Sequence, residues 1–203
     1  MKELIFDEAI KHLSKDNVLK SVIDKVRLPK RTHNDDVYLG LLNSIISQQL
    51  SVKAAATIYG RFLDLFDEQY PDAKDLLALN NDQLRGVGLS GQKSKYVKNV
   101  AHYFQEHNLF DRDWTQDSDE EVISLLTEIK GVGRWTVQMI LMFVLLRQDV
   151  LPVLDLGIQQ GIKLLYGIEA EKKALFAKME EVAAPWKPYR SAACLYLWAA
   201  KDA

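Results

Sequence analysis

A glycine turn and an acid that follows it are the residues of this sequence best suited to chemistry. The turn is Lys130-Gly131-Val132-Gly133-Arg134, and the acid is Asp155. Two glycines two residues apart allow positive φ angles and a close approach of the main chain to a ligand. A helix is expected to begin at Gly133 or Arg134, so its free N–H groups and the Arg134 charge form a site for an anion such as phosphate.

The elements that position these residues are predicted to be helices. An apolar helical segment ends at Ile129, and a strongly apolar helix runs from the turn to about Leu146. A proline-containing, strand-like link at residues 150–154 then delivers Asp155. This pattern is typical of a helix-hairpin-helix, which holds a DNA backbone without reading base sequence. The alternatives are an ordinary corner with glycine at the C-cap and, for Asp155, a simple helix N-cap.

The composition is that of an ordinary globular chain. Of its 203 residues 48% are hydrophobic and 27% charged, and no apolar run is long enough to cross a membrane. Acids stand in the first residues, where a signal peptide would have none, so we expect a cytoplasmic, nucleoid-associated protein, and a monomer. The single cysteine, Cys194, excludes a disulfide framework within the chain and a four-cysteine metal or iron–sulfur site.

The distribution of charge is more informative than its sum. A net charge of −2 argues against a nonspecific nucleic-acid binder. Three stretches, 83–105, 129–148 and 182–201, nevertheless contain no acid. Their basic side chains are expected to form a face that tracks phosphates, unless they are only solvated helix faces. These side chains are Arg85, Lys93, Lys95, Lys98, Lys130, Arg134, Arg147, Lys187, Arg190 and Lys201.

Helical periodicity dominates the chain, and no alternating Val/Ile/Thr-rich hairpin occurs, so the predicted fold is all-α. Ser118 with Glu121 and Asn80 with Gln83 form predicted capping boxes. The predicted helices lie at about 5–14, 16–26, 36–48, 51–66, 72–78, 80–85, 90–106, 118–129, 133–147, 155–166, 169–183 and 188–201.

A weak internal repeat precedes the main turn. Residues 83–97 contain Gly86-Val87-Gly88 followed by Ser90 as a helix N-cap and by Lys93 and Lys95, which resembles the later Gly-Val-Gly turn. Two interpretations stay open, a second phosphate contact or merely a matching corner between helices.

Five segments together give the chain a family likeness, because they occur in the right order and spacing over roughly residues 40–200. The chain resembles the helix-hairpin-helix–GPD superfamily of DNA base-excision glycosylases, and within it the 3-methyladenine-DNA glycosylase II branch. The segments are Ile46-Ser47-Gln48-Gln49-Leu50-Ser51 with Ala54-Ala55-Ala56, Gly86-Val87-Gly88-Leu89-Ser90 with Lys93 through Tyr96, Lys130 through Thr136, Leu151-Pro152-Val153-Leu154-Asp155, and Trp186 through Ser191 followed by Leu195 to Trp198.

The resemblance implies two helical subdomains with an active-site cleft between them. Residues 36–147 would form the central subdomain with the helix-hairpin-helix, and residues 1–35 plus 148–203 the second, which carries the catalytic Asp155. The chain has no room for the extra N-terminal β domain of longer bacterial members.

The chemistry implied is hydrolysis of the N-glycosidic bond of an alkylated purine, such as 3-methyladenine, that has been flipped out of duplex DNA. A carboxylate beside the sugar stabilises the oxocarbenium-like transition state, and Asp155 is the candidate, either positioning or deprotonating the attacking water. Bifunctional members carry a nucleophilic lysine where this chain has Trp135, so no β-lyase activity is expected. A noncatalytic structure-specific DNA-binding protein, or a helical scaffold for a protein partner, is the alternative.

The resemblance also assigns binding residues. The base pocket would use Trp135, Met139 and Tyr189, because an aromatic face attracts a cationic alkylated base; core packing is the alternative for each. Trp186 and Trp198 are expected to be structural. Gln49 or Leu50 would fill the hole left in the duplex. The DNA backbone would be bound by Gly131, Val132, Gly133, Arg134 and Thr136, and by Gly86, Gly88, Ser90 and Lys93.

The same resemblance implies a structural Na⁺ or K⁺ on main-chain carbonyls of Ile129 and Val132. No other cofactor is required, and the iron–sulfur cluster of other branches is excluded by the lone cysteine.

Overall fold

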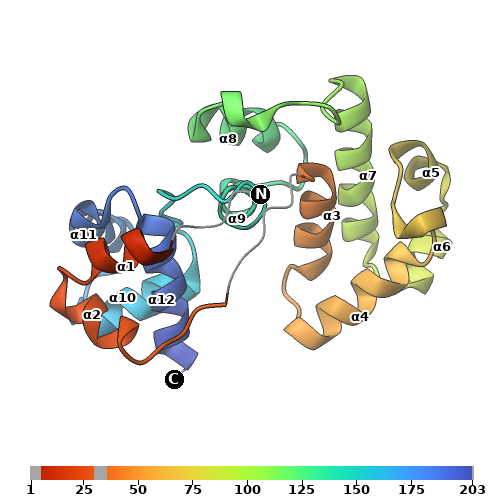
Figure 1. Cartoon of the computed structure of the whole chain (residues 1–203). Coiled ribbons are helices and arrows are strands. Elements are labelled where there is room, and N and C mark those ends of the chain that lie inside the picture. Colours follow the sequence, from red (N-terminus) through yellow and green to blue (C-terminus); the bar gives the residue numbers. More distant parts are fainter. Residues whose placement is uncertain (1–5, 30–35, 203) are drawn as a thin grey trace. The chain divides into compact units, whose positions relative to one another are not determined.

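The computed structural model describes residues 6–29 and 36–202, and over these ranges it is built from helices without a β-strand, which confirms the predicted all-α fold (Figure 1). The first residue of the helix predicted at 5–14 lies outside the described residues, as does the side chain of Lys201. The chain divides into two compact units. One joins Met1–Asn34 to Leu141–Ala203, and the other is the continuous stretch Asp35–Ile140. No helix in the described ranges has the length and apolar character needed to span a membrane.

The discontinuous unit is organised around its C-terminal helix. Helix α12 packs against α10, α2 and α1, and a Cβ added to Gly161 of α10 would lie 2.9 Å from the carbonyl oxygen of Leu197. Only a glycine therefore lets α10 and α12 approach so closely. The elements of this unit, besides the end of α9, are α1 (Phe6–Leu13), α2 (Asn17–Ile23), α10 (Leu156–Tyr166), α11 (Lys172–Ala183), η3 (Ala184–Trp186) and α12 (Arg190–Asp202).

A single carboxylate joins three elements of this unit. Asp16 caps α2 through hydrogen bonds from the N–H groups of Val18 and Leu19. Its second oxygen accepts from the hydroxyl of Tyr166 at 2.7 Å and from the indole N–H of Trp186 at 3.0 Å. Burial raises the pKa of Asp16, but these hydrogen bonds outweigh burial and leave the pKa below its ordinary value.

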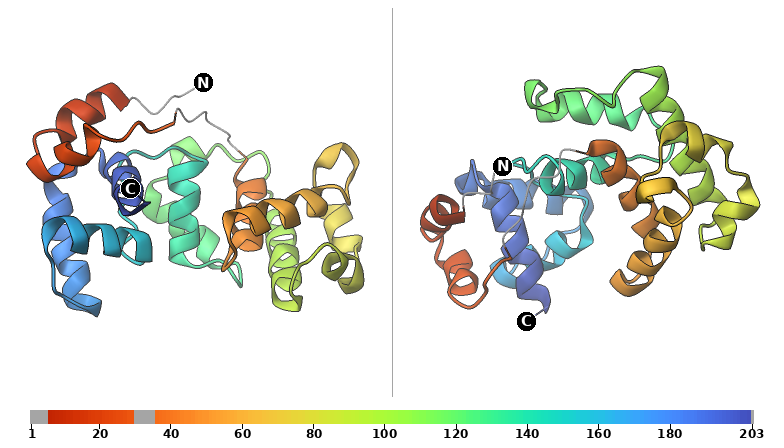
Figure 2. Two further views of the ribbon diagram at one scale, coloured as in Figure 1. Left: turned by 90° about the horizontal axis from the view of Figure 1, so that it is seen from below. Right: turned by 45° about the vertical axis from the view of Figure 1, so that its right-hand side comes forward.

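The continuous unit is arranged around α7, which lies alongside α3 and α5 and also contacts α6 (Figures 1 and 2). Val97, Val100 and Phe104 of α7 are buried against these neighbours. The elements of this unit are α3 (Val37–Ser47), α4 (Val52–Leu63), η1 (Asp67–Gln69), α5 (Ala73–Ala78), α6 (Asn81–Gly86), α7 (Gly91–Glu106), η2 (Trp114–Gln116), α8 (Asp119–Thr127) and most of α9 (Arg134–Phe143).

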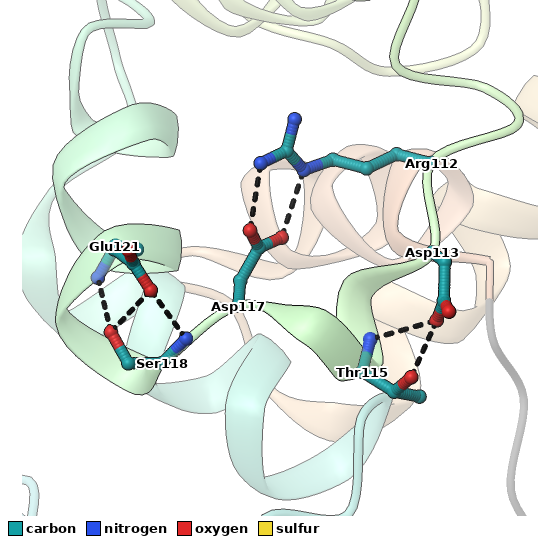
Figure 3. Close-up of polar contacts among 6 residues, drawn as sticks. All are labelled: Arg112, Asp113, Thr115, Asp117, Ser118 and Glu121. Carbon is teal, nitrogen blue, oxygen red and sulfur yellow. Dashed lines mark hydrogen bonds and ion pairs between the residues drawn. The ribbon is translucent and has the colours of Figure 1, made fainter.

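The connection from α7 to α8 is fixed by local polar contacts (Figure 3). Arg112 donates two hydrogen bonds of 2.8 Å to the carboxylate of Asp117. Asp113 accepts from the main-chain N–H of Thr115 at 3.0 Å. Ser118 and Glu121 then form the predicted capping box. The start of α8, the helix that precedes the glycine turn, is thus specified by residues that lie close together in the sequence.

Helix α9 ends at Phe143, earlier than the sequence predicts. Leu146 adopts a left-handed φ of 49°, and the N–H of Arg147 bonds to the carbonyl of Leu141 at 2.8 Å, which closes a wide turn. Leu145 and Leu146 are nevertheless buried. The apolar periodicity therefore predicts correctly that Leu145 and Leu146 are buried, but it does not predict that the helix ends before them.

Candidate functional site

The predicted hairpin is present between α8 and α9. Gly131 has a φ of 108°, and a Cβ at this position would lie 2.3 Å from Cγ of Tyr96 on α7. Asn99 of the same helix donates to the carbonyl of Lys130 at 2.9 Å. Helix α9 begins at Arg134, one of the two residues predicted. The turn therefore requires glycine both for its conformation and for its contact with α7.

The earlier glycine corner matches the hairpin in a shifted register. Here Gly88, the second glycine, has the positive φ of 107°, and Ser90 caps α7 by accepting from the N–H of Lys93. In both corners the left-handed glycine precedes its helix by three residues, Gly88 before Gly91 and Gly131 before Arg134. The two corners therefore share a backbone geometry, but equivalent places in the two Gly-Val-Gly sequences do not correspond. In the structure Gly88 corresponds to Gly131.

Four of the predicted phosphate-tracking side chains have protein partners in the structure. Lys93 donates to the carbonyls of Ile46 and Gln48, and Lys98 donates to those of Leu77 and Leu79. Arg190 forms a bidentate pair with Asp149, and Arg134 forms one with Glu120. Each of these four cations therefore contacts a partner within its own unit, which the sequence does not predict because it does not show where a long side chain points.

The pair between Arg134 and Glu120 is a surface contact. The Nη1–Oε2 distance is 3.0 Å, the Arg134 side chain is 48% exposed, and the hydrogen bond from Arg134 lowers the pKa of Glu120. Exposed pairs of this kind contribute little to stability, about 0–1 kcal/mol. The guanidinium is therefore available for exchange onto another anion.

Three of the predicted phosphate-tracking side chains in the continuous unit are both exposed and unpaired. Arg85, Lys95 and Lys130 make no side-chain hydrogen bond or ion pair with any residue between 36 and 140. Lys95 and Lys130 are the sequence neighbours of Tyr96 and Gly131, which meet where α7 contacts the hairpin, and both belong to the predicted phosphate-tracking set. The sequence alone does not show that these two side chains are exposed and free to meet a phosphate.

The turn between α3 and α4 presents the two predicted wedge residues. Gln49 is exposed with a left-handed φ of 58°, and Leu50 is 37% exposed. Neither side chain is therefore buried in the turn. Val52, at the start of α4, is 89% exposed. The turn and the start of α4 thus expose two apolar side chains, those of Leu50 and Val52, to solvent.

Thr136, predicted to bind the DNA backbone, has its side chain in the interior. It is only 3% exposed, and its Oγ1 lies 3.5 Å from Nε2 of Gln48. The side chain therefore links α9 to the end of α3. The main-chain N–H in the first turn of α9 is the group of this residue that stays suited to an anion.

Asp155 lies at the start of α10 in the discontinuous unit. Residues 152–155 form a turn, in which the Asp155 N–H bonds to the Pro152 carbonyl at 2.9 Å, rather than the strand-like link expected. Its Oδ1 accepts from the N–H of Ile158 at 2.9 Å, so the predicted cap is present. The same oxygen accepts from the indole N–H of Trp198 at 2.8 Å. The carboxylate is thereby held in one orientation.

Trp198, expected to be structural, makes a contact with Asp155 that the sequence did not predict. Its ring stacks on Phe143 with centroids 5.7 Å apart, and a Cβ at residue 157 would lie 2.7 Å from Trp198 Cδ1, so glycine is required there. The sequence feature that could have indicated this contact is the position of Trp198 in the C-terminal segment that resembles the family. Trp186, also expected to be structural, is buried and donates its indole N–H to Asp16.

The segment before Asp155 is held by the first turns of α12. The hydroxyl of the buried Ser191 donates to the Arg147 carbonyl at 2.6 Å and accepts from the Val150 N–H at 3.0 Å. Arg190 adds its bidentate pair with Asp149. Helix α12 therefore fixes both Asp155 and the chain that leads to it.

The predicted base-pocket residues are distributed over both units. Trp135 and Met139 lie one turn apart on α9, with Trp135 partly exposed and Met139 buried. Tyr189 belongs to the discontinuous unit, where its hydroxyl donates to Glu8 at 3.3 Å and its ring lies 5.4 Å from that of His12. Burial of Met139 fits packing as well as a pocket wall, so its predicted role stays a prediction.

The predicted monovalent cation involves carbonyls at the hairpin. The Ile129 carbonyl accepts the Val132 N–H at 2.9 Å, which leaves a second lone pair on that oxygen. Within the described ranges no group of three or more His, Cys, Asp or Glu side chains is placed to hold a metal ion. The cation therefore depends on main-chain oxygens alone and stays a prediction.

Comparison with known proteins agrees with this geometry. Residues 42–185 match the family described as HhH-GPD superfamily base excision DNA repair protein. The chain belongs to this superfamily. The HhH-GPD chain is 33% identical to DNA-3-methyladenine glycosylase 1 of Schizosaccharomyces pombe over 183 residues, which cover 89% of this chain and 79% of the relative.

Two solved structures are similar over nearly the whole HhH-GPD chain. One is the S. pombe 3-methyladenine DNA glycosylase Mag1 in complex with abasic DNA, with a TM-score of 0.83, 30% identity and 97% of each chain covered. The other is a DNA-3-methyladenine glycosidase from Bacillus halodurans, with a TM-score of 0.77, 36% identity, and 98% of this chain and 92% of that chain covered.

Proposed function

We propose that this protein is a monofunctional DNA glycosylase of the 3-methyladenine-DNA glycosylase II type, which hydrolyses the N-glycosidic bond of alkylated purines such as 3-methyladenine. The observation that carries the proposal is the carboxylate of Asp155, held by the Ile158 N–H and the Trp198 indole in a chain that also contains the hairpin. The S. pombe and B. halodurans relatives named for this activity support it. The setting is intracellular duplex DNA, bound by a monomer.

The reaction follows from the charge of Asp155. As the bond between C1′ and the base nitrogen breaks, its electron pair leaves with the base and positive charge develops on the sugar. A fixed carboxylate stabilises that charge without having to reorient. Water then bonds to C1′, and Asp155 positions it and takes its proton. A cationic 3-alkyladenine becomes neutral when it leaves, so no acid is needed to protonate it.

The absence of lyase chemistry rests on residue 135. A β-lyase of this superfamily uses an amine to attack C1′ and form a Schiff base. Trp135 stands at that position in this chain, and an indole nitrogen is not such a nucleophile. We therefore expect the product to be an intact abasic strand rather than a nicked one.

DNA binding would use the two glycine corners and the exposed cations. The first N–H groups of α9 and the charges of Arg134, Arg85, Lys95 and Lys130 suit phosphates. Arg134 would exchange its surface pair with Glu120 for a phosphate. The partly exposed indole of Trp135 would face a cationic base.

The test is release of free base from methylated duplex DNA, followed by gel analysis of the strand. The expected result is free 3-methyladenine together with a strand that stays whole until alkali is added. Failure to release 3-methyladenine, 7-methylguanine, ethenoadenine or hypoxanthine would contradict the enzyme and favour a noncatalytic DNA-binding protein. A strand nicked without alkali, or trapped covalently by borohydride, would contradict the monofunctional mechanism.

A further inference from the structure

The ammonium of Lys93 lies at the end of a neighbouring helix. Its Nζ donates to the carbonyls of Ile46 and Gln48, each at 2.7 Å. Ile46 belongs to the last turn of α3, and Gln48 is its C-cap. The last carbonyls of a helix have no partner inside the helix and carry partial negative charge. Lys93 therefore supplies donors and a positive charge where α3 lacks both.

The turn that Lys93 contacts is weakly held by its own backbone. The Gln48 N–H bonds to Ile45 at 3.4 Å and the Leu50 N–H bonds to Ser47 at 3.2 Å. Gln49 has a φ of 58°, a conformation that costs a non-glycine residue about 1–2 kcal/mol. An exposed, strained turn with long hydrogen bonds needs an outside contact to keep one geometry, and the two bonds from Lys93 are that contact.

We propose that Lys93 is a positioning residue for base flipping, which holds the main chain of the turn from Gln48 to Leu50 so that its exposed side chains enter the duplex in one geometry. This inference rests on the proposed function. It also changes the predicted role of Lys93, whose ammonium would act on the protein's own carbonyls rather than on a DNA phosphate. Because the Lys93 N–H also bonds to Ser90 at 3.2 Å, the phosphate-binding corner and the turn are joined through one residue.

Lys98 provides a matched control within the same helix. Its Nζ donates to the carbonyls of Leu77 and Leu79 at the end of α5. Two lysines of α7 therefore each donate to the C-terminal carbonyls of a neighbouring helix. Helix α5 carries no residue assigned to DNA binding. Loss of either ammonium leaves two carbonyls without a charged donor, and the effects on folding should be similar.

The experiment compares Lys93→Met, Lys93→Arg and Lys98→Met with the wild type. Single-turnover base release, duplex affinity at several salt concentrations and thermal unfolding are measured for each. Fluorescence of a 2-aminopurine placed next to the lesion reports unstacking independently of chemistry. In Lys93→Met the release rate and the fluorescence change should both fall, the rate by roughly 10–100-fold, as expected for misplacement by about an ångström.

The other outcomes separate positioning from the alternatives. Lys98→Met should unfold at a similarly lowered temperature and keep the wild-type rate and fluorescence change, while Lys93→Arg should recover part of both. The proposal is overturned if Lys93→Met loses no more rate than Lys98→Met. It is also overturned if the only effect is a salt dependence weaker by about one charge, which would identify a phosphate ligand. A wild type that unstacks the duplex without releasing base would contradict the proposed function and leave this inference standing.

Discussion

The hydrogen bond between Trp198 and Asp155 gives a sharp quantitative prediction. Trp198→Phe removes the indole N–H that lies 2.8 Å from Asp155 Oδ1 and retains an aromatic ring against Phe143. A hydrogen bond to a charged group contributes about 1.5–3 kcal/mol. If the carboxylate must keep its orientation in the transition state, the loss corresponds to a fall of roughly 10–100-fold in rate, at about 1.4 kcal/mol per tenfold.

Trp186→Phe is the control for this change. Trp186 donates its indole N–H to Asp16 at 3.0 Å, so both tryptophans bond an aspartate that caps a helix. Single-turnover base release at saturating enzyme measures the chemical step, and thermal unfolding measures the structural cost. Trp198→Phe should lower the rate, whereas Trp186→Phe should lower only the unfolding temperature. Equal rates for Trp198→Phe and the wild type would refute the claim that the indole positions the carboxylate proposed to be catalytic.

The remaining predictions concern stability and DNA binding. Asp16 has a lowered pKa in the folded protein, so its stabilisation is complete above the unfolded pKa of about 3.9 and is lost as pH falls through the folded value. Denaturant unfolding should show Asp16→Asn destabilised at neutral pH and nearly equal to wild type in strong acid; a constant difference would contradict this. Lys95→Gln with Lys130→Gln should flatten the plot of log affinity against log salt by about 2 units, and an unchanged slope would exclude both from phosphate contact. Gly131→Ala should destabilise by at least about 1–2 kcal/mol, while Gly133→Ala, whose added Cβ meets nothing within 4 Å, should melt like the wild type; equal melting of both would refute the packing argument.

Features encoded by neighbouring residues were predictable from the sequence. The capping boxes at Ser118 and Asn80 occur as expected, because each is complete within four residues. The start of α9 at Arg134 follows from the glycine turn before it. Asp155 caps α10 as the alternative interpretation proposed, and this role coexists with its proposed catalytic one.

Features that depend on partners distant in the sequence were not predictable. Lys93 bonds to a carbonyl 47 residues away, and Trp198 bonds to an acid 43 residues away. The sequence shows that a lysine is charged and that a tryptophan has an apolar ring, but it does not show which way either side chain points. The register of the repeat was wrong for a related reason, because only the φ angles show that Gly88 matches Gly131.

The most direct test of the account is base release from methylated duplex DNA by Asp155→Asn and by the wild type. The asparagine retains an oxygen that can accept from Ile158 and Trp198, so the cap and the shape are kept while the charge is removed. We expect the wild type to release 3-methyladenine, and the variant to bind the duplex equally well but to release base slower by orders of magnitude. Equal release by both proteins would remove the Asp155 charge from the mechanism and contradict the central claim.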